Sequence, residues 1–252
     1  MGTPRSSRGD VGYRDRIYRC YVEARGETSA PPDAAELDAR AHTLRRVVRR
    51  HFPDNRDAAV LDLGCGYGAL VRTAHECGYR KTWGVDRSAQ QVAAAARLGI
   101  ADVREGDLVE TLSSQSDESH DVIVTFDVIE HLTKDELVAL ADDVRRVLRP
   151  GGRWIIHAPN AESPMFGRIR YGDFTHEQAF TRFSISQLLL SSGFKRVMCE
   201  EDGPVVHGAK SAARWLLWKF LRGCLRIYLA AETGSVEREA IFTQNFIAVA
   251  TK

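Results

Sequence analysis

The sequence predicts an α/β fold in which a mostly parallel β-sheet is covered by helices on both faces. Three observations predict it. From residue 57 onward, apolar runs of strand length alternate with amphipathic runs of helix length. The first apolar run ends in a glycine-rich turn that opens a helix, which leaves backbone N–H groups available to a ligand. The length of 252 residues suits one such domain with a modest insertion.

The N-terminal part precedes this alternation. Residues 1–12 are polar and basic, which predicts a disordered arm, and helical patterns follow at 13–24 and 34–51. We expect residues 1–56 to form this arm and a helical cap over a domain that comprises residues 57–252.

Within the domain, strands and helices are expected in alternation. The expected strands are 58–63, 81–86, 101–105, 121–126, 153–158, 194–200 and 242–251, and the expected helices are 69–77, 88–98, 134–148, 184–192 and 209–231. The polar stretch at 113–120 is expected to be a surface loop between two strands, and 158–180 a long loop at the carboxyl edge of the sheet.

Composition excludes several classes of function. The 35 lysines and arginines nearly balance the 34 aspartates and glutamates, so we expect no nucleic-acid partner. The five cysteines are odd in number and widely spaced, without a CxxC pair, which predicts a reducing, cytoplasmic compartment. The N-terminal segment has no apolar core, so we expect neither a secretory signal nor a membrane-spanning helix.

The sharpest motif is the glycine turn after the first strand. Gly64, Gly66 and Gly68 allow a ligand to approach the backbone closely, although a tight turn without a ligand would use the same residues. The string also fits the Gly-x-Gly-x-x-Ala pattern of nicotinamide dinucleotide sites. Asp62 argues for another ligand, because a carboxylate there suits the ammonium of a methionine moiety better than a pyrophosphate.

Two further strand ends carry candidate binding residues. Asp86 follows Gly64 by twenty-two positions and is placed to accept hydrogen bonds from both hydroxyls of a ribose. It could instead cap the next helix, but Ser88 can do so equally well, which would leave Asp86 free. Asp107 could accept a hydrogen bond from an adenine amino group, and Leu108 could pack on the ring.

Five segments, in this order, resemble the successive motifs of small-molecule class I methyltransferases: DLGCGYG, GVD, EGD, FDVIEHL and LRPGGRWIIHAPN. The resemblance spans about residues 57–160 and implies a Rossmann-like, seven-stranded sheet with a reversed last hairpin and a helical insertion before the last strand. It also implies S-adenosylmethionine as the methyl donor. The donor-binding residues that follow are Asp62, Gly64, Cys65, Gly66, Gly68, Asp86, Arg87, Asp107, Leu108 and Phe126.

The acceptor is expected to be a sugar hydroxyl of a glycan or glycoconjugate. The fourth strand ends in Phe-Asp-Val-Ile and lacks the Asn/Asp-Pro-Pro-aromatic signature of DNA base methylation. The loop 158–180 and the ending at 243–246 resemble methyltransferases of polysaccharide and glycoconjugate biosynthesis. The loop could also be purely structural. A quinone-like or phenolic acceptor, a nicotinamide-dependent oxidoreductase and a catalytically idle binding protein stay open as alternatives.

Transfer to a hydroxyl needs a base, and His131 and His176 are the candidates, with Asp173 beside His176 as a catalytic partner. We expect no metal requirement. Nevertheless, Asp127, Glu130 and His131 resemble the divalent-metal cluster of ubiquinone-pathway O-methyltransferases, although such a trio on one turn can also be merely solvated.

The segment 209–231 combines aromatic and aliphatic residues with five basic residues and no acidic ones. Lys219, Arg222 and Arg226 are expected to share one helix face, and the apolar surface is wider than a helix on a core needs. The helix would pack on the sheet, form a dimer interface, or lie on the anionic inner face of a membrane.

Overall fold

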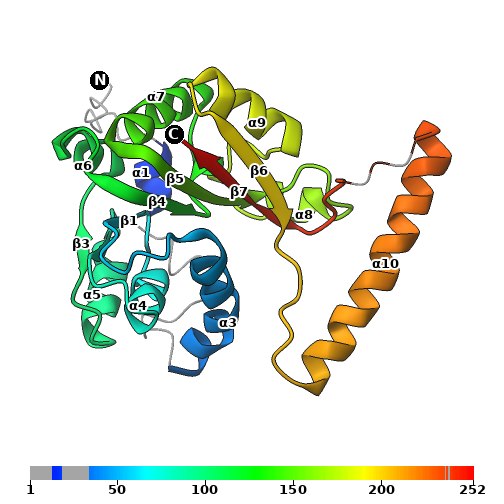
Figure 1. Ribbon diagram of the computed structural model, residues 1–252, viewed down its shortest axis with the longest axis horizontal. Coiled ribbons are helices and arrows are strands. Elements are labelled where there is room, and N and C mark those ends of the chain that lie inside the picture. Colours follow the sequence, from blue (N-terminus) through cyan, green and yellow to red (C-terminus); the bar gives the residue numbers. More distant parts are fainter. Residues whose placement is uncertain (1–12, 19–33, 236, 238) are drawn as a thin grey trace, which may run out of the picture.

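The computed structural model describes residues 13–18, 34–235, 237 and 239–252. In this part of the chain, one sheet has seven strands in the order β3-β2-β1-β4-β5-β7-β6 (Figure 1). Strand β7 is antiparallel to both of its neighbours, and the other pairings are parallel. The strands are β1 (Val60–Leu63), β2 (Thr82–Asp86), β3 (Val103–Glu105), β4 (His120–Phe126), β5 (Leu148–Pro159), β6 (Arg196–Glu201) and β7 (Asn245–Thr251). The predicted seven-stranded sheet with a reversed last hairpin is confirmed.

Helices cover both faces of the sheet (Figure 1). On one face lie α3 (Ala34–His51), α4 (Ala69–Glu76) and α5 (Ala89–Arg97), and on the other α6 (Leu108–Ser114), α7 (Lys134–Val147) and α9 (Arg182–Ser191). The central strands are apolar on both sides because each side meets helices: Val60 packs toward α3 and α4, whereas Leu61 packs toward the other face.

Helix α3, the expected cap, packs directly on the sheet. Leu44, Val47, Val48 and Phe52 belong to the same buried cluster as side chains of α4, β1 and β4. The expected division after residue 56 stays a prediction. The expected arm at 1–12 and the second half of the helix at 13–24 lie outside the described residues; α1 (Tyr13–Tyr18) is the described part of that helix.

Two segments differ from expectation. The polar stretch at 113–120 is not a loop throughout, because α6 ends inside it at Ser114. Helix α6 forms because Asp107 caps it, accepting hydrogen bonds from the backbone N–H groups of Val109 and Glu110. The expected loop 158–180 contains a short helix, α8 (Phe166–Arg170).

Helix α10 (Ala209–Thr233) is the insertion between β6 and β7 and lies beyond the β6 edge of the sheet (Figure 1). Lys219, Arg222 and Arg226 follow one another at spacings of three and four residues in this helix, so they share one side of it as expected, but they are not equally exposed. Lys219 is exposed, but Arg222 and Arg226 are half-buried, and Arg222 Nε donates to Glu201 Oε1 at 2.8 Å. Among the described residues, every helix is too short or too polar to cross a bilayer.

Candidate functional site

The glycine turn after β1 forms the floor of the candidate donor site. Gly64, Gly66 and Gly68 all have left-handed backbones, with φ of 73°, 55° and 81°. A Cβ on Gly64 would lie 2.5 Å from Val128 Cγ2, so packing requires the glycine. A Cβ on Gly66 would meet nothing closer than Gln91 Oε1 at 4.0 Å. The backbone at Gly66 therefore borders open space that a ligand can occupy.

Asp62 lies directly before this turn and is only 1% exposed. Its Oδ1 atom is buried without a hydrogen-bond partner among the described residues. Burial, with a smaller contribution from the Asp86 carboxylate, raises the pKa of Asp62 to about 8. A buried carboxylate without a partner is unfavourable unless a cation pairs with it, and the ammonium group of S-adenosylmethionine would be such a cation.

Asp86, at the end of β2, is not free as expected. Its Oδ2 accepts a hydrogen bond from the Gly66 N–H at 2.8 Å, and its Oδ1 accepts one from the Ser88 N–H at 2.9 Å. The second half of the expectation is correct, because Ser88 caps α5 by accepting from the Gln91 N–H. The carboxylate thus ties the glycine turn to the end of β2. Arg87 beside it is exposed.

The remaining predicted donor residues line the same carboxyl edge with different local roles. Cys65 is half-buried against Gly84, and its thiol pKa is raised by burial. Asp107 uses Oδ1 to cap α6, so only its other carboxylate oxygen is left for the predicted contact with adenine, which stays a prediction. Leu108 is partly buried against the core. Phe126 ends β4.

Phe126 stacks on His157, a residue that the sequence analysis did not select. The two ring centroids are 4.8 Å apart and the planes differ by 8°. His157 lies between two carboxylates, with Nδ1 2.7 Å from Asp127 Oδ1 and Nε2 3.3 Å from Asp202 Oδ2. Burial alone would lower the pKa of His157, but the two carboxylates outweigh it and raise the pKa to about 10. His157 is therefore a buried imidazolium that holds Phe126 and Asp127 in place.

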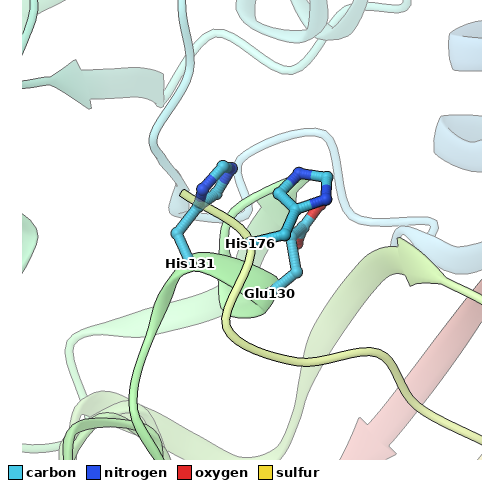
Figure 2. Close-up of side chains that lie close together, drawn as sticks. All are labelled: Glu130, His131 and His176. Atoms are coloured by element: carbon cyan, nitrogen blue, oxygen red, sulfur yellow. The ribbon is translucent and has the colours of Figure 1, made fainter. Parts of the chain in front are cut away.

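Glu130, His131 and His176 form the second half of the site (Figure 2). Glu130 and His131 belong to the short 3-10 helix η1 (Ile129–His131), and His176 comes from the loop after β5. One ligand atom from each residue lies within 4.8 Å of the others. The loop is held here because the Glu130 carbonyl accepts hydrogen bonds from the Glu177 and Gln178 N–H groups.

Hydrogen bonds assign the same tautomer to both histidines. Thr175 Oγ1 donates to Asp173 Oδ1 at 2.6 Å, so it accepts from His131 Nδ1, 2.8 Å away. His176 Nδ1 donates to the Ile169 carbonyl at 3.0 Å. Each neutral ring therefore carries its lone pair on Nε2. Burial and the neighbouring His176 lower the pKa of His131 to about 4, and burial also lowers the pKa of His176.

Glu130 is buried, and its Oε2 atom has no hydrogen-bond partner among the described residues. Burial, followed by the nearby Asp127 carboxylate, raises the pKa of Glu130 well above its ordinary value. Two imidazole nitrogens and one carboxylate suit a divalent cation of intermediate hardness. This trio differs from the predicted one: Asp127 points to His157, and His176 takes its place.

A hollow of about 520 Å³ opens beside His176. Its wall includes three aromatic rings, of which Tyr171 is 75% and Phe174 82% exposed. The remaining lining residues are Tyr13, Arg170, Asp173 and Glu177. Tyr13 packs edge-on against Phe174 and hydrogen-bonds to Glu177, so α1 contributes to this wall.

The structure thus brings together the predicted catalytic residues: Thr175 links His131 to Asp173, and the His176 ring lies edge-on to that of His131. His157 was missed, although it lies next to the end of the predicted strand 153–158, at the edge where ligands bind in such sheets. Asp202 was missed because its contact with His157 joins positions forty-five residues apart, which no local pattern reveals.

Comparisons with known proteins agree with this geometry. Residues 37–198 match the family model described as "Methyltransferase domain". A probable S-adenosylmethionine-dependent methyltransferase of Mycolicibacterium smegmatis is 33% identical over 201 residues, which cover 79% of this chain and 74% of that protein. A similarly named protein of Mycobacterium tuberculosis is 30% identical over 204 residues, covering 78% and 70%.

Among solved structures, a SAM-dependent methyltransferase from Archaeoglobus fulgidus has the same fold, with a TM-score of 0.63 and 20% identity. The alignment covers 87% of this chain and all of that one. The open space at Gly66, the unpaired carboxylate oxygen of Asp62 and the sheet order all fit the donor. The chain therefore belongs to the methyltransferase domain family and is an S-adenosylmethionine-dependent methyltransferase.

Proposed function

We propose that this enzyme methylates a sugar hydroxyl of a glycan or glycoconjugate. The observation that carries the proposal is the neutral His131, held by Thr175 and Asp173 close to an open hollow with exposed aromatic rings. The C–H faces of sugar rings can stack on aromatic rings, and sugar hydroxyls can form hydrogen bonds with the charged groups of Arg170 and Glu177. A hollow of about 520 Å³ has room for one or two sugar units.

The residues of the chain have separable tasks in this reaction. When bound, S-adenosylmethionine supplies an already activated methyl group on its sulfonium. Asp62 neutralises the ammonium end, and Gly66 leaves space for the ligand. His131 accepts the proton of the sugar hydroxyl at Nε2, while the hydrogen bond from Nδ1 to Thr175 keeps the ring oriented. Asp173 orients Thr175 and stabilises the positive charge that His131 gains.

Transfer of a labelled methyl group to a panel of acceptors tests the proposal. The panel contains short oligosaccharides and their glycosides, with catechol as the comparison. His131→Ala should lower kcat on the sugar acceptor by about 100-fold or more with donor affinity intact, and His176→Ala should have a smaller effect. His75→Ala, on α4, is the matched control. Methylation of catechol but of no sugar would contradict the proposal, and so would equal, small losses in both variants.

A second candidate is metal-assisted methylation of a phenol. The cluster of Glu130, His131 and His176 favours it, because a divalent cation held there would bind a deprotonated phenol oxygen. In this case, activity on catechol should vanish with a chelator and return with Zn²⁺ or Mn²⁺. Elemental analysis should find the metal in the wild type and at least about tenfold less in Glu130→Gln. Full activity of metal-free protein would exclude this candidate.

A further inference from the structure

Helix α10 carries many of its large apolar side chains on the side that faces away from the protein. At the sheet edge its inner side contains Arg222, which pairs with Glu201 at 2.8 Å, and Trp218, which lies against Gly203. On the outer side, Phe220 is 68% exposed and Ile227 is 72% exposed. A helix that only covers its own core shows the opposite distribution.

The exposed apolar residues form one continuous strip along the helix, which we call the outer stripe: Leu216, Leu217, Phe220, Leu221, Ile227 and Tyr228. They recur at spacings of three, four, seven and eleven residues, so they share one side of the helix. An exposed apolar patch of this extent marks an interaction surface in soluble proteins.

The charges beside the outer stripe indicate what it meets. Lys210, Arg214 and Lys219 are exposed, and the sequence has no acidic residue from 203 to 231. Lys219 lies 5.2 Å from the ring centre of Trp215, which places an aromatic ring and a cation together at one edge of the stripe. An anionic surface complements this charge. A second copy of the chain would bring the same positive excess to the contact.

The geometry also determines how the helix can meet a bilayer. Charged residues in the middle of α10 prevent it from spanning, in agreement with the absence of a membrane-crossing helix among the described residues. A helix of 25 residues with an apolar outer side and cationic edges is suited to lie in the plane of the headgroups. Trp215 and Tyr228 would then lie at headgroup depth.

We infer that α10 docks the enzyme reversibly on a bilayer of anionic lipids through the outer stripe. Lys210, Arg214 and Lys219 contact the lipid headgroups, and Arg222 keeps the helix attached to β6. The inference does not rest on the identity of the methyl acceptor, because α10 contributes no residue to the hollow beside His176.

Sedimentation of the full chain with vesicles tests the inference. The wild type should bind phosphatidylglycerol-containing vesicles at least about tenfold more tightly than pure phosphatidylcholine vesicles, and added salt should release it. F220E/I227E should lose binding to both, because it places charge in the outer stripe. K210E/R214E/K219E should lose the preference for phosphatidylglycerol. L190E, which alters an exposed apolar residue of α9, is the matched control and should bind as the wild type does.

Far-ultraviolet circular dichroism and S-adenosylmethionine affinity identify folded variants, because the donor site is remote from α10. Sedimentation equilibrium without lipid tests the alternative, in which the outer stripe contacts a second copy of the chain. A wild type that binds no vesicles would overturn the inference. If the wild type binds no vesicles but forms a dimer, and F220E/I227E is monomeric, the outer stripe is a contact with a second copy. Folded F220E/I227E that binds vesicles as tightly as the wild type does would also overturn the inference.

Discussion

At the scale of single residues, the candidate donor site and the proposed acceptor site each contain a buried carboxylate. One oxygen of each carboxylate lacks a hydrogen-bond partner among the described residues. Asp62 Oδ1 is that atom at the donor end, and Glu130 Oε2 is that atom near the acceptor hollow. Burial of such an oxygen is unfavourable unless a ligand compensates for it. Each atom therefore indicates either that a cationic group binds beside it or that the carboxyl group is protonated.

Asp62 should lose a proton when S-adenosylmethionine binds. Its pKa of about 8 means that it is mostly protonated near neutral pH without ligand, and an adjacent ammonium favours the ionised form. Isothermal titration in two buffers with different ionisation enthalpies should show release of up to about one proton near pH 7. Asp62→Asn should release none and bind about tenfold or more weakly. The same proton release in Asp62→Asn would contradict this role.

His131 should remain a competent base well below neutral pH. Because burial and His176 lower its pKa to about 4, the ring stays neutral as pH falls through the range in which an ordinary histidine becomes charged. We expect kcat/KM on the true acceptor to stay level between about pH 8 and pH 5. Thr175→Val removes the hydroxyl that orients the ring and should lower kcat about tenfold or more without changing donor affinity. A loss of activity centred near pH 6.5 would indicate a different base.

At the scale of elements, the turn from β1 to α4 combines two kinds of glycine. Gly68 is required by packing, because a Cβ there would lie 2.6 Å from Val103 Cγ2 and 3.1 Å from Ile100 Cγ2. Gly66 borders open space instead. Both have positive φ, so a side chain at either position costs roughly 1 kcal/mol in backbone strain.

The two glycines should therefore respond differently to alanine. Gly66→Ala should lower the free energy of unfolding by about 1 kcal/mol and weaken donor binding about tenfold or more, because its Cβ enters the ligand space. Gly68→Ala should destabilise the fold by clearly more than this, since the clash with Val103 adds to the strain. Urea unfolding and calorimetric titration of both variants measure the two effects. Equal destabilisation with equal binding loss would mean that Gly66 does not border the donor.

At the scale of the whole molecule, a chain of charges joins α3, β4, β5 and the segment after β6. Arg46 pairs with Asp202 at 2.6 Å, Asp202 contacts His157, and His157 contacts Asp127. The network connects the expected cap helix to the strand end that carries Phe126 and Asp127. It also fixes Asp202, which lies seven residues before α10 begins at Ala209.

This network should stabilise the fold less at high pH. The folded pKa of His157, about 10, lies above the ordinary value of 6.5, so its contribution is fully present below about pH 6.5 and is lost as pH rises through 10. Over that interval the free energy of unfolding should fall by up to about 1.4 kcal/mol per pH unit. His157→Gln should remove this dependence, and His75→Gln should retain it. Urea unfolding at a series of pH values measures this dependence. If the free energy of unfolding changes with pH in the same way in the wild type and in His157→Gln, the network is not its source.

The sequence by itself determined the class of fold and, through the resemblance of its strand-end motifs, the methyl donor. Alternation of apolar and amphipathic runs and the order of strand-end motifs are local signals, and the carboxyl ends of parallel strands meet at one edge. Asp62, Gly66 and Asp86 could therefore be selected from spacing alone. Helix α6 was missed because its short polar sequence depends on the cap by Asp107.

Only the tertiary structure decided which side chains meet across that edge. His176 joins Glu130 and His131 because the loop after β5 hydrogen-bonds to the Glu130 carbonyl, and Asp127 turns instead to His157. The outward orientation of the apolar side of α10 was likewise undecided, because helical periodicity shows which residues share a face but not which way that face points. Orientation depends on a contact between distant residues, the pairing of Arg222 with Glu201, and long-range contacts of this kind leave no local pattern in a sequence.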